Sequence, residues 1–263
     1  MTEILPPGEN GEIEILQEGL KRAGEIVLGY WRHAPPVRQE KTRHSTVTEA
    51  DLASERFLID WIKKHFPHDD ILSEESPHEV GPRFWTIDPI DGTSSFQRGL
   101  EEWSIALARV NNGKVDIGMI YAPAKKELFY AKDKQEAFLN GKKISVSNAD
   151  NLRYSLIYIG YDALRADEKG TVWNMVRKTG RLWTIGSTSL ALAYLAAGRI
   201  DVVIQKAQPA WDFSAGLVLV REAGGKFTTW KDQEQFDFSS SKNNDILATN
   251  DLLHPQVLPY LTD

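Results

Sequence analysis

The chain has 263 residues, of which 41% are hydrophobic and 26% charged, as in an ordinary globular protein of one large domain or two small ones. Its formal net charge of −6 argues against a nucleic-acid-binding surface, and a sequence without cysteine excludes disulfides, thiol nucleophiles and cysteine-ligated metals. The acidic N-terminus shows no secretory signal and no stretch is apolar enough to span a membrane. We therefore expect a cytoplasmic protein without membrane or nucleic-acid partners.

The first half of the chain begins with helical spacing of hydrophobic residues and then changes to the alternation of strands. We expect helices over 11–31 and 48–66, joined by a polar loop over 34–46. Thr48 is placed to be the N-cap of the second helix, with Asp51 three residues later in a capping-box pattern. Strands are expected at four places: 84–87, 103–110, 114–122 and 127–131.

In the second half, strands and helices alternate. Strands are expected at four places: 155–161, 200–205, 226–230 and 245–250. Helices are expected over 169–180, 187–197 and 212–223, with a last one after Leu252. This order predicts an α+β fold or layered sandwich, formed by one domain of residues 1–263 whose two halves meet near residue 150.

The segment FWTIDPIDGTSSF, at 84–96, ends an apolar strand in two aspartates. We expect the strand to end at Ile87, so that Pro89 turns the chain and Asp88 and Asp91 face the same opening. Two carboxylates about 4 Å apart repel each other by roughly 4 kcal/mol at an effective dielectric near 20, and a divalent cation offsets that repulsion. Oxygen ligands without His or Cys suit Mg²⁺, Mn²⁺ or Ca²⁺. The alternative is an Asx-turn before a capped helix.

The following residues extend this pattern. Gly92 permits a positive φ or the close approach of a ligand, and Thr93 begins a helix whose free N–H groups can bind an anion. Three further acids lie at the ends of elements: Glu74 follows an apolar segment, and Asp51 and Asp212 each open a helix. An acid at a helix start can be a simple cap, but the four positions together favour a shared site.

These motifs resemble the inositol monophosphatase family of lithium-sensitive, magnesium-dependent phosphatases, which also includes fructose bisphosphatases and nucleotide 3′-phosphatases. Its two signature stretches occur as DPIDGTSSF (88–96) and WDFSAG (211–216). Other family-like stretches follow in the family's order: VTEAD (47–51), LSEES (72–76), GSTSLALAYLAAGRID (186–201) and REAGGKF (221–227). The resemblance, from about residue 12 to about residue 250, implies an αβαβα sandwich, a homodimer and hydrolysis of a small sugar or inositol phosphate by metal-activated water.

The resemblance also implies how a metal centre would be built. Two to three Mg²⁺ ions would bind, and Mn²⁺ can substitute for them. The first would be held by Glu74, Asp88 and the carbonyl of Ile90, and the second by Asp88, Asp91 and Asp212. A third, weaker ion would lie near Glu74, with the segment from Lys41 to Asp51 closing over it.

The remaining roles that the resemblance implies concern water and substrate. Thr93 and Asp51, together with the metal ligand Glu74, would act in catalysis by orienting the attacking water. The backbone of Gly92 and Thr93 would bind the phosphate. The residues expected along the substrate are Gly186, Ser187, Thr188, Gln205 and Asp212.

One position departs from the family pattern. Gln205 lies seven residues before Asp212, where many inositol phosphatases have a glutamate that contacts the sugar ring. Fructose 1,6-bisphosphate, 3′-phosphoadenosine 5′-phosphate and histidinol phosphate therefore stay open as substrates. An inactive phosphate- or metal-binding module is the non-enzyme alternative. A haloacid-dehalogenase-type phosphatase is disfavoured, because its nucleophilic aspartate would fall at Pro89.

Overall fold

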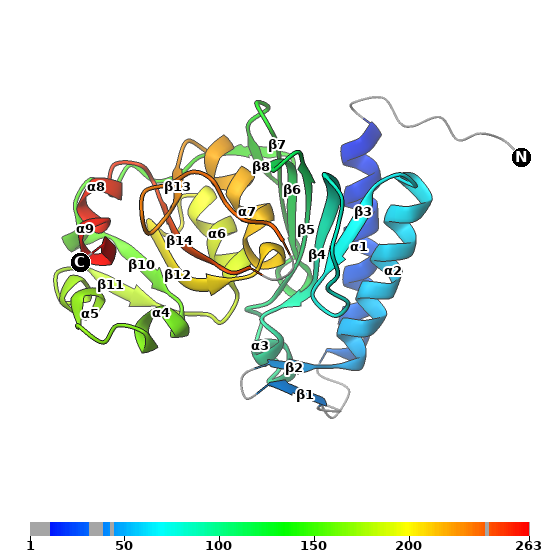
Figure 1. Cartoon of the computed structure of the whole chain (residues 1–263), viewed down its shortest axis with the longest axis horizontal. Helices are drawn as coiled ribbons and strands as arrows, with labels where there is room; N and C mark the ends of the chain where they lie inside the picture. The colour runs from blue at the N-terminus through cyan, green and yellow to red at the C-terminus, as the bar shows by residue number, and fades with distance from the viewer. Residues whose placement is uncertain (1–10, 32–38, 43–44, 240–241, 263) are drawn as a thin grey trace, which may run out of the picture.

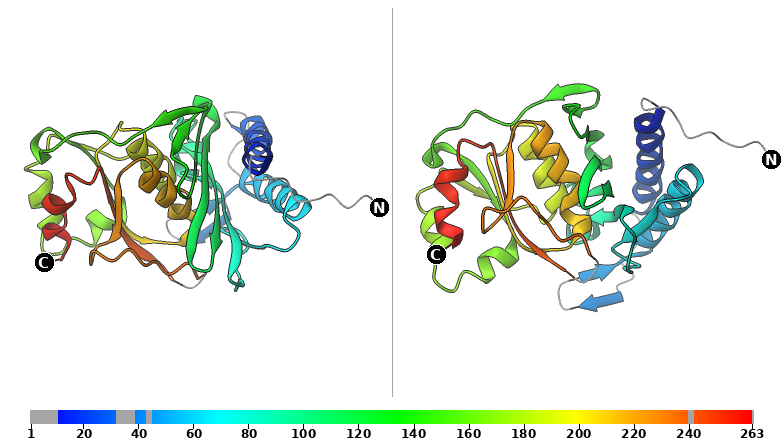
Figure 2. Two further views of the ribbon diagram at one scale, coloured as in Figure 1. Left: turned by 90° about the horizontal axis from the view of Figure 1, so that it is seen from above. Right: turned by 45° about the horizontal axis from the view of Figure 1, so that its top comes forward.

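The computed structural model describes residues 11–31, 39–42, 45–239 and 242–262, without the side chains of 39–47. Layers of helices and sheets alternate along its long axis (Figure 1), and the same succession is visible from two further directions (Figure 2). This confirms the predicted α+β fold of αβαβα type. In the described part of the chain, no helix is long and apolar enough to cross a membrane.

The outer helical layer and the first sheet come from the first half of the chain. The layer consists of α1 (Gly11–Tyr30) and α2 (Glu49–His65), which pack on a seven-stranded sheet of the described residues. In spatial order the strands of this sheet are β3 (Asp70–Ser73), β4 (Arg83–Asp91), β5 (Ser104–Asn111), β6 (Lys114–Ala122), β7 (Glu127–Lys132), β8 (Ala137–Leu139) and β9 (Lys142–Ile144). Only β3 and β4 pair in parallel, and the predicted turn at 111–113 joins β5 to β6.

The second half of the chain supplies the central helices, the second sheet and the last helical layer. The central helices are α6 (Thr188–Ala196) and α7 (Ala210–Glu222). In spatial order the strands of the second sheet are β11 (Arg181–Trp183), β10 (Leu156–Ile159), β12 (Val202–Gln208), β14 (Asn244–Thr249) and β13 (Lys226–Thr229). On its far face lie the short helices α4 (Tyr161–Arg165), α5 (Thr171–Val176), α8 (His254–Val257) and α9 (Pro259–Thr262).

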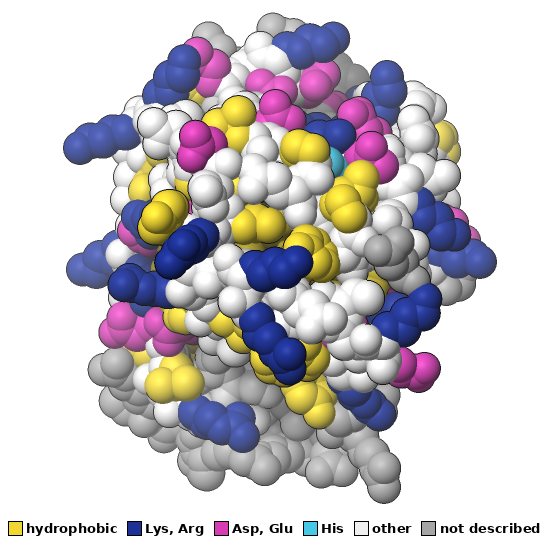
Figure 3. Space-filling model, turned by 90° about the vertical axis from the view of Figure 1, so that its left-hand side faces the viewer, with side chains coloured by type: hydrophobic (Ala, Val, Ile, Leu, Met, Phe, Trp, Pro, Cys, Tyr) yellow, Lys and Arg dark blue, Asp and Glu magenta, His cyan; other side chains and the backbone are white. Residues whose placement is uncertain are grey.

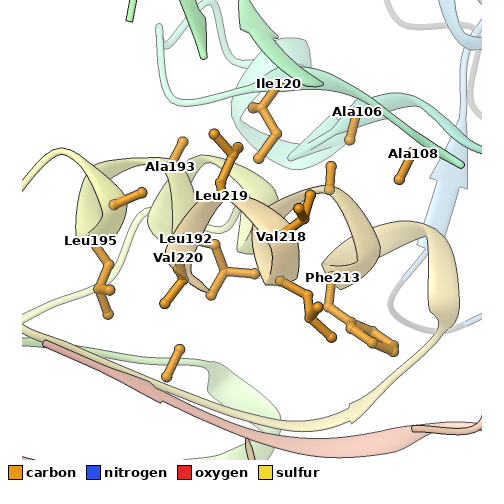
Figure 4. Close-up of a cluster of buried hydrophobic side chains, with 14 of the residues drawn as sticks. Ala106, Ala108, Ile120, Leu192, Ala193, Leu195, Phe213, Val218, Leu219 and Val220 are labelled. Atoms are coloured by element: carbon orange, nitrogen blue, oxygen red, sulfur yellow. The ribbon is translucent and has the colours of Figure 1, made fainter. Parts of the chain in front are cut away.

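The central layer packs against both sheets. Every residue of α6 is buried, as expected for a helix that is apolar on all sides. Figure 4 shows side chains of α6 and α7, among them Leu192 and Val218, filling the space beneath Ala106 and Ile120 of the first sheet. Glycines permit the close contacts: a Cβ at Gly118 of β6 would lie 2.5 Å from the carbonyl oxygen of Ala215 in α7.

The structure corrects three local predictions. The expected loop over 34–46 contains two paired strands, β1 (Gln39–Thr42) and β2 (Ser45–Val47), although part of it lies outside the described residues. The helix expected over 169–180 is limited to α5, because Gly170 with φ 72° stands directly before it and the strand β11 follows. Pairing with β10 keeps β11 in the sheet, a long-range effect that local spacing does not reveal.

The third correction concerns β4, which continues to Asp91 instead of ending at Ile87. The pairing with β3 stops at Ile87, so no β3 partner faces Pro89, whose missing N–H therefore costs no ladder bond there. On the other side, the pairing with β5 shifts between Asp88 and Asp91, which indicates a β-bulge. The bulge, rather than a turn, brings both aspartates to the same end of the sheet.

Gly118→Ala tests the close packing of α7 on the first sheet. We expect it to destabilise the protein by about 1–3 kcal/mol, because the new methyl group overlaps the backbone of α7. The matched control is Gly29→Ala in the exposed part of α1, where a Cβ meets nothing within 4 Å and helix propensity favours alanine by up to about 1 kcal/mol. Urea denaturation measures both; equal effects would contradict the packing described.

Candidate active site

Four other acids that the sequence singled out lie around Asp88. Burial is the largest cause of its raised pKa, and the charges of Glu74, Asp91, Asp212 and Asp51 raise it further. These residues come from β4, the segment after β3, the first turn of α2 and the first turn of α7. The fold thus assembles, from segments more than a hundred residues apart, the carboxylates that the motifs predicted to lie together.

Asp51 is both a helix-capping residue and a member of this cluster. The predicted capping box is confirmed: the Asp51 amide donates to the Thr48 hydroxyl, and the Thr48 amide donates to Asp51 Oδ2 at 2.8 Å. The other oxygen, Oδ1, is buried and has no hydrogen-bond partner among the described residues. Burial raises the pKa of Asp51 to about 6, with a further contribution from the charge of Glu75. Capping alone does not account for a buried, unpartnered oxygen.

Asp91 is directed to the N-terminus of α6. Its Oδ2 accepts hydrogen bonds from the Ser187 hydroxyl at 2.7 Å and the Ser189 amide at 2.6 Å, and its Oδ1 accepts from the Thr188 amide at 3.3 Å. The Ser189 hydroxyl donates to the backbone carbonyl of Asp212 at 2.8 Å. The segment predicted to line the substrate therefore lies at the acid cluster, and α6 connects β4 to α7 there.

Gly92 lies between β4 and the short helix α3 (Thr93–Gln97), which Thr93 begins. Gly92 has a φ of 93°, and a Cβ on it would lie 2.8 Å from the carbonyl oxygen of Glu102. Both its conformation and its surroundings thus require glycine. The Thr93 hydroxyl donates to the carbonyl oxygen of Ile90 at 3.1 Å, so two residues that the resemblance assigned to water and metal are in contact.

Gln205 is buried in a network of neutral polar groups beside the site. Its Nε2 donates to the Thr188 hydroxyl at 2.6 Å and lies 3.4 Å from the Tyr158 hydroxyl. The Thr188 hydroxyl in turn donates to Gln208 Oε1 at 2.7 Å, and a Cβ at Gly160 would overlap the Gln205 amide. Tyr158 and Gln208 were not predicted as site residues, since Tyr158 lies in a stretch expected to be a strand and Gln208 belongs to none of the motifs.

The donor set suits a hard divalent cation in chemistry, although the side chains do not form a finished cage. Among the described segments, no group of three or more His, Cys, Asp and Glu side chains is arranged to hold a metal as it stands. Both carboxylate oxygens of Asp91 already accept hydrogen bonds from the first residues of α6. The pKa values of Asp88 and Asp212 are nevertheless raised by burial and by neighbouring carboxylates, a condition that a bound cation relieves. The unpartnered Asp51 Oδ1 also fits an oxygen-ligand site.

One predicted element of the site is described only in part. The segment from Lys41 to Asp51 was expected to close over a third ion. Its side chains up to Val47 lie outside the described residues, and the structure gives only the backbone of β1 and β2 there. Its closure stays a prediction.

Asp51→Asn tests the buried carboxylate in metal-free protein. The folded-state pKa of Asp51, about 6, exceeds its ordinary 3.8, so the native state holds the extra proton between these values and stability falls as pH rises through them. At pH 7, this titration lowers the free energy of unfolding by about 3 kcal/mol. Asparagine keeps an acceptor for Thr48 and does not titrate. Between pH 4 and pH 7, we expect the free energy of unfolding of the variant to rise by about 2 kcal/mol relative to wild type.

Urea denaturation in EDTA at the two pH values measures this difference. The control is Asp60→Asn, an exposed position on the same helix, for which we expect no comparable gain. An equal pH dependence of Asp51→Asn and wild type would contradict the burial of an ionisable group at this position.

Known proteins with similar sequences and structures identify the family of the chain. A model of the inositol monophosphatase family matches residues 11–263. The chain is 36% identical over 245 residues to the fructose-1,6-bisphosphatase/inositol-1-monophosphatase of Thermotoga maritima, with 93% of each chain covered. It is 34% identical over 224 residues to the Nus factor SuhB of Salmonella typhimurium, covering 81% of this chain and 83% of the relative.

Among solved structures, an IMPase of Thermotoga maritima matches with a TM-score of 0.85 and 34% identity over 97% of both chains. The match extends over both sheets and the helices between them. The chain belongs to the inositol monophosphatase family and is a phosphatase.

Proposed function

We propose that the protein is an Mg²⁺-dependent phosphomonoesterase acting on a small sugar or inositol phosphate. The observation that carries this proposal is the cluster of carboxylates around the buried Asp88. A phosphate monoester dianion is repelled by such a cluster, so the site accepts it only when a cation has reversed the local charge. A module that only binds phosphate has no use for several buried acids.

The proposed ligands follow the grouping that the resemblance implied. Glu74, Asp88 and the Ile90 carbonyl would hold one ion, and Asp88 would share a second with Asp91 and Asp212. A third, weaker ion would lie near Glu74, and Mn²⁺ can replace Mg²⁺. When bound, the metal supplies positive charge to the phosphate and the leaving oxygen and makes water a better nucleophile at neutral pH.

The chain's own groups would orient the water and the substrate. Thr93, whose hydroxyl already contacts the Ile90 carbonyl, and Asp51, whose Oδ1 has no partner in the described part of the chain, would position the water together with Glu74. The backbone N–H groups of Gly92 and Thr93 would bind the phosphate. The leaving group would lie along the segment 186–188.

Gln205 bears on the substrate. Its amide belongs to a neutral network with Thr188 and Gln208, which suits hydroxyl groups of a sugar or polyol better than a second phosphate. A relative is named for both fructose-1,6-bisphosphatase and inositol-1-monophosphatase activity, so both substrates belong in any test, together with 3′-phosphoadenosine 5′-phosphate and histidinol phosphate. A cytoplasmic location stays a prediction, as does lithium sensitivity, which the same assay tests with millimolar Li⁺.

Phosphate release from a panel of monoesters, with Mg²⁺ and with EDTA, tests the function. The panel holds these four substrates and glycerol 2-phosphate. We expect metal-dependent release with one preferred substrate, and a loss of about two orders of magnitude or more in Asp91→Asn, because the change keeps the shape and removes one charge. Asp60→Asn is the control and should keep full activity. An active Asp91→Asn enzyme would rule out the metal assignment, and no release from any substrate would favour a binding module.

The homodimer that the resemblance implied is part of this proposal. Figure 3 shows the side of the molecule that carries α5, β11 and α9, with apolar side chains lying among lysines and arginines. Large side chains are exposed on these and neighbouring elements: Tyr154 is 80%, Tyr161 67% and Leu182 37% exposed. Several such side chains close to the sheet-edge strand β11 suit a protein–protein contact.

Light scattering of Tyr161→Glu and Leu182→Glu tests the dimer. A charge buried at an interface without a partner is unfavourable, so we expect these variants to shift the protein to monomer while wild type is a dimer. Leu52→Glu, also exposed but on α2 in the opposite helical layer, is the matched control and should not change the mass. A monomeric wild type would overturn this part of the proposal.

A further inference from the structure

Helix α2 presents a polar face to the site that the proposed chemistry uses only in part. Asp51, Ser54 and Glu55 are all buried and, at spacings of three and four residues, lie on the same side of the helix. Asp51 belongs to the acid cluster. Ser54 and Glu55 have no part in the proposed water, metal or phosphate contacts. Each is nevertheless hydrogen-bonded to another acid-bearing segment, Ser54 to β4 and Glu55 to the segment after β3.

Glu55 is hydrogen-bonded to the segment after β3. Its Oε1 accepts a hydrogen bond from the Ser76 hydroxyl at 2.8 Å, two residues beyond Glu74. The backbone amide of Glu74 donates to the carbonyl oxygen of Ile87 at 3.2 Å. The segment is therefore attached to β4 through the backbone of Glu74 and to α2 through Ser76, two residues later.

Ser54 is hydrogen-bonded to the backbone of the bulge in β4. Its hydroxyl, which is fully buried, donates to the carbonyl oxygen of Pro89 at 3.2 Å. Pro89 lies between Asp88 and Ile90, at the point where pairing with β5 is irregular and pairing with β3 has ended. A carbonyl in such a bulge lacks a regular ladder partner, and Ser54 supplies a donor from outside the sheet.

Buried polar residues on this face of α2 stabilise the fold less than apolar residues would. Glu55 is 7% exposed, and burying a carboxylate in place of an apolar side chain is unfavourable unless it is hydrogen-bonded. An apolar side chain would fill the same helix face without that cost, as Leu58 does one turn later. The hydrogen bond to Ser76 has a benefit that packing does not supply: it fixes the segment that carries Glu74 relative to Asp51.

We propose that Glu55 and Ser54 are positioning residues, which hold the segment of Glu74 and the bulge of Asp88 and Ile90 at fixed places relative to Asp51. The inference rests on the proposed function, in which these residues bind metal. Groups that orient metal ligands typically change metal affinity by about 10- to 100-fold when they are removed. Loss of Glu55 should therefore weaken metal binding and raise the Mg²⁺ concentration needed for activity, while activity at saturating Mg²⁺ is largely kept.

Mn²⁺ binding by calorimetry, Mg²⁺ dependence of phosphate release and thermal unfolding test the proposal together. We expect Glu55→Ala and Ser76→Ala each to weaken Mn²⁺ binding by about tenfold or more, with no further loss in the double variant, because both remove the same hydrogen bond. Glu55→Gln keeps an acceptor for Ser76 and should bind Mn²⁺ nearly as wild type. Ser54→Ala should weaken binding in the same direction.

The controls separate this inference from the proposed function. Glu49→Ala, an exposed acid on the same helix, should leave Mn²⁺ binding unchanged. If Glu55→Ala fails to fold, Ser76→Ala at an exposed position carries the same test. Variants that lower the unfolding temperature but bind Mn²⁺ as wild type would overturn the positioning role. If Asp88→Asn also binds Mn²⁺ as wild type, the metal site itself is wrong.

Discussion

Electrostatic repulsion among the carboxylates around Asp88 is the constraint on which the site and its supports depend. Three helix N-termini face it: Asp51 lies in the first turn of α2, Asp212 in the first turn of α7, and Asp91 accepts hydrogen bonds from the first residues of α6. Each helix dipole stabilises a nearby anion by about 0.3–1 kcal/mol, whereas one close carboxylate pair repels by roughly 4 kcal/mol. The helices therefore reduce the repulsion without removing it, which leaves a site that favours protons or cations.

The layered fold explains how these helix ends reach one place. Because α6 and α7 are apolar and packed between two sheets, their N-termini are held firmly against the end of the first sheet. Gly118 and Gly216 allow this packing: a Cβ at the first would meet α7, and one at the second would meet Leu192 of α6. The burial that fixes the helices is also the main cause of the raised pKa values of Asp88 and Asp212.

Local signals in the sequence predicted the four longest helices, most strands, the capping box of Thr48 and the segments that carry the acids. The signals are local because a cap or a turn is set by residues three or four positions apart. The path of β4 through Pro89 was not predictable, since it depends on where β3 stops. The bonds of Asp91 to α6 and of Gln205 to Tyr158 span 98 and 47 positions, and no short pattern encodes them.

Helix α2 takes part both in the packing of the fold and in the arrangement of the acids. Its apolar face, with Leu58 and Ile62, packs on α1 and the first sheet, while its polar face carries Asp51 and the residues that contact both acid-bearing segments. A helix that is fixed by burial can hold several short segments with hydrogen bonds that would be weak in water. The outer layer of the fold therefore does more than cover the sheet. Any ligand that binds the acids in the native state stabilises that state by mass action. Because α2 contacts the acids and also packs on α1 and the first sheet, this stabilisation includes the first half of the chain.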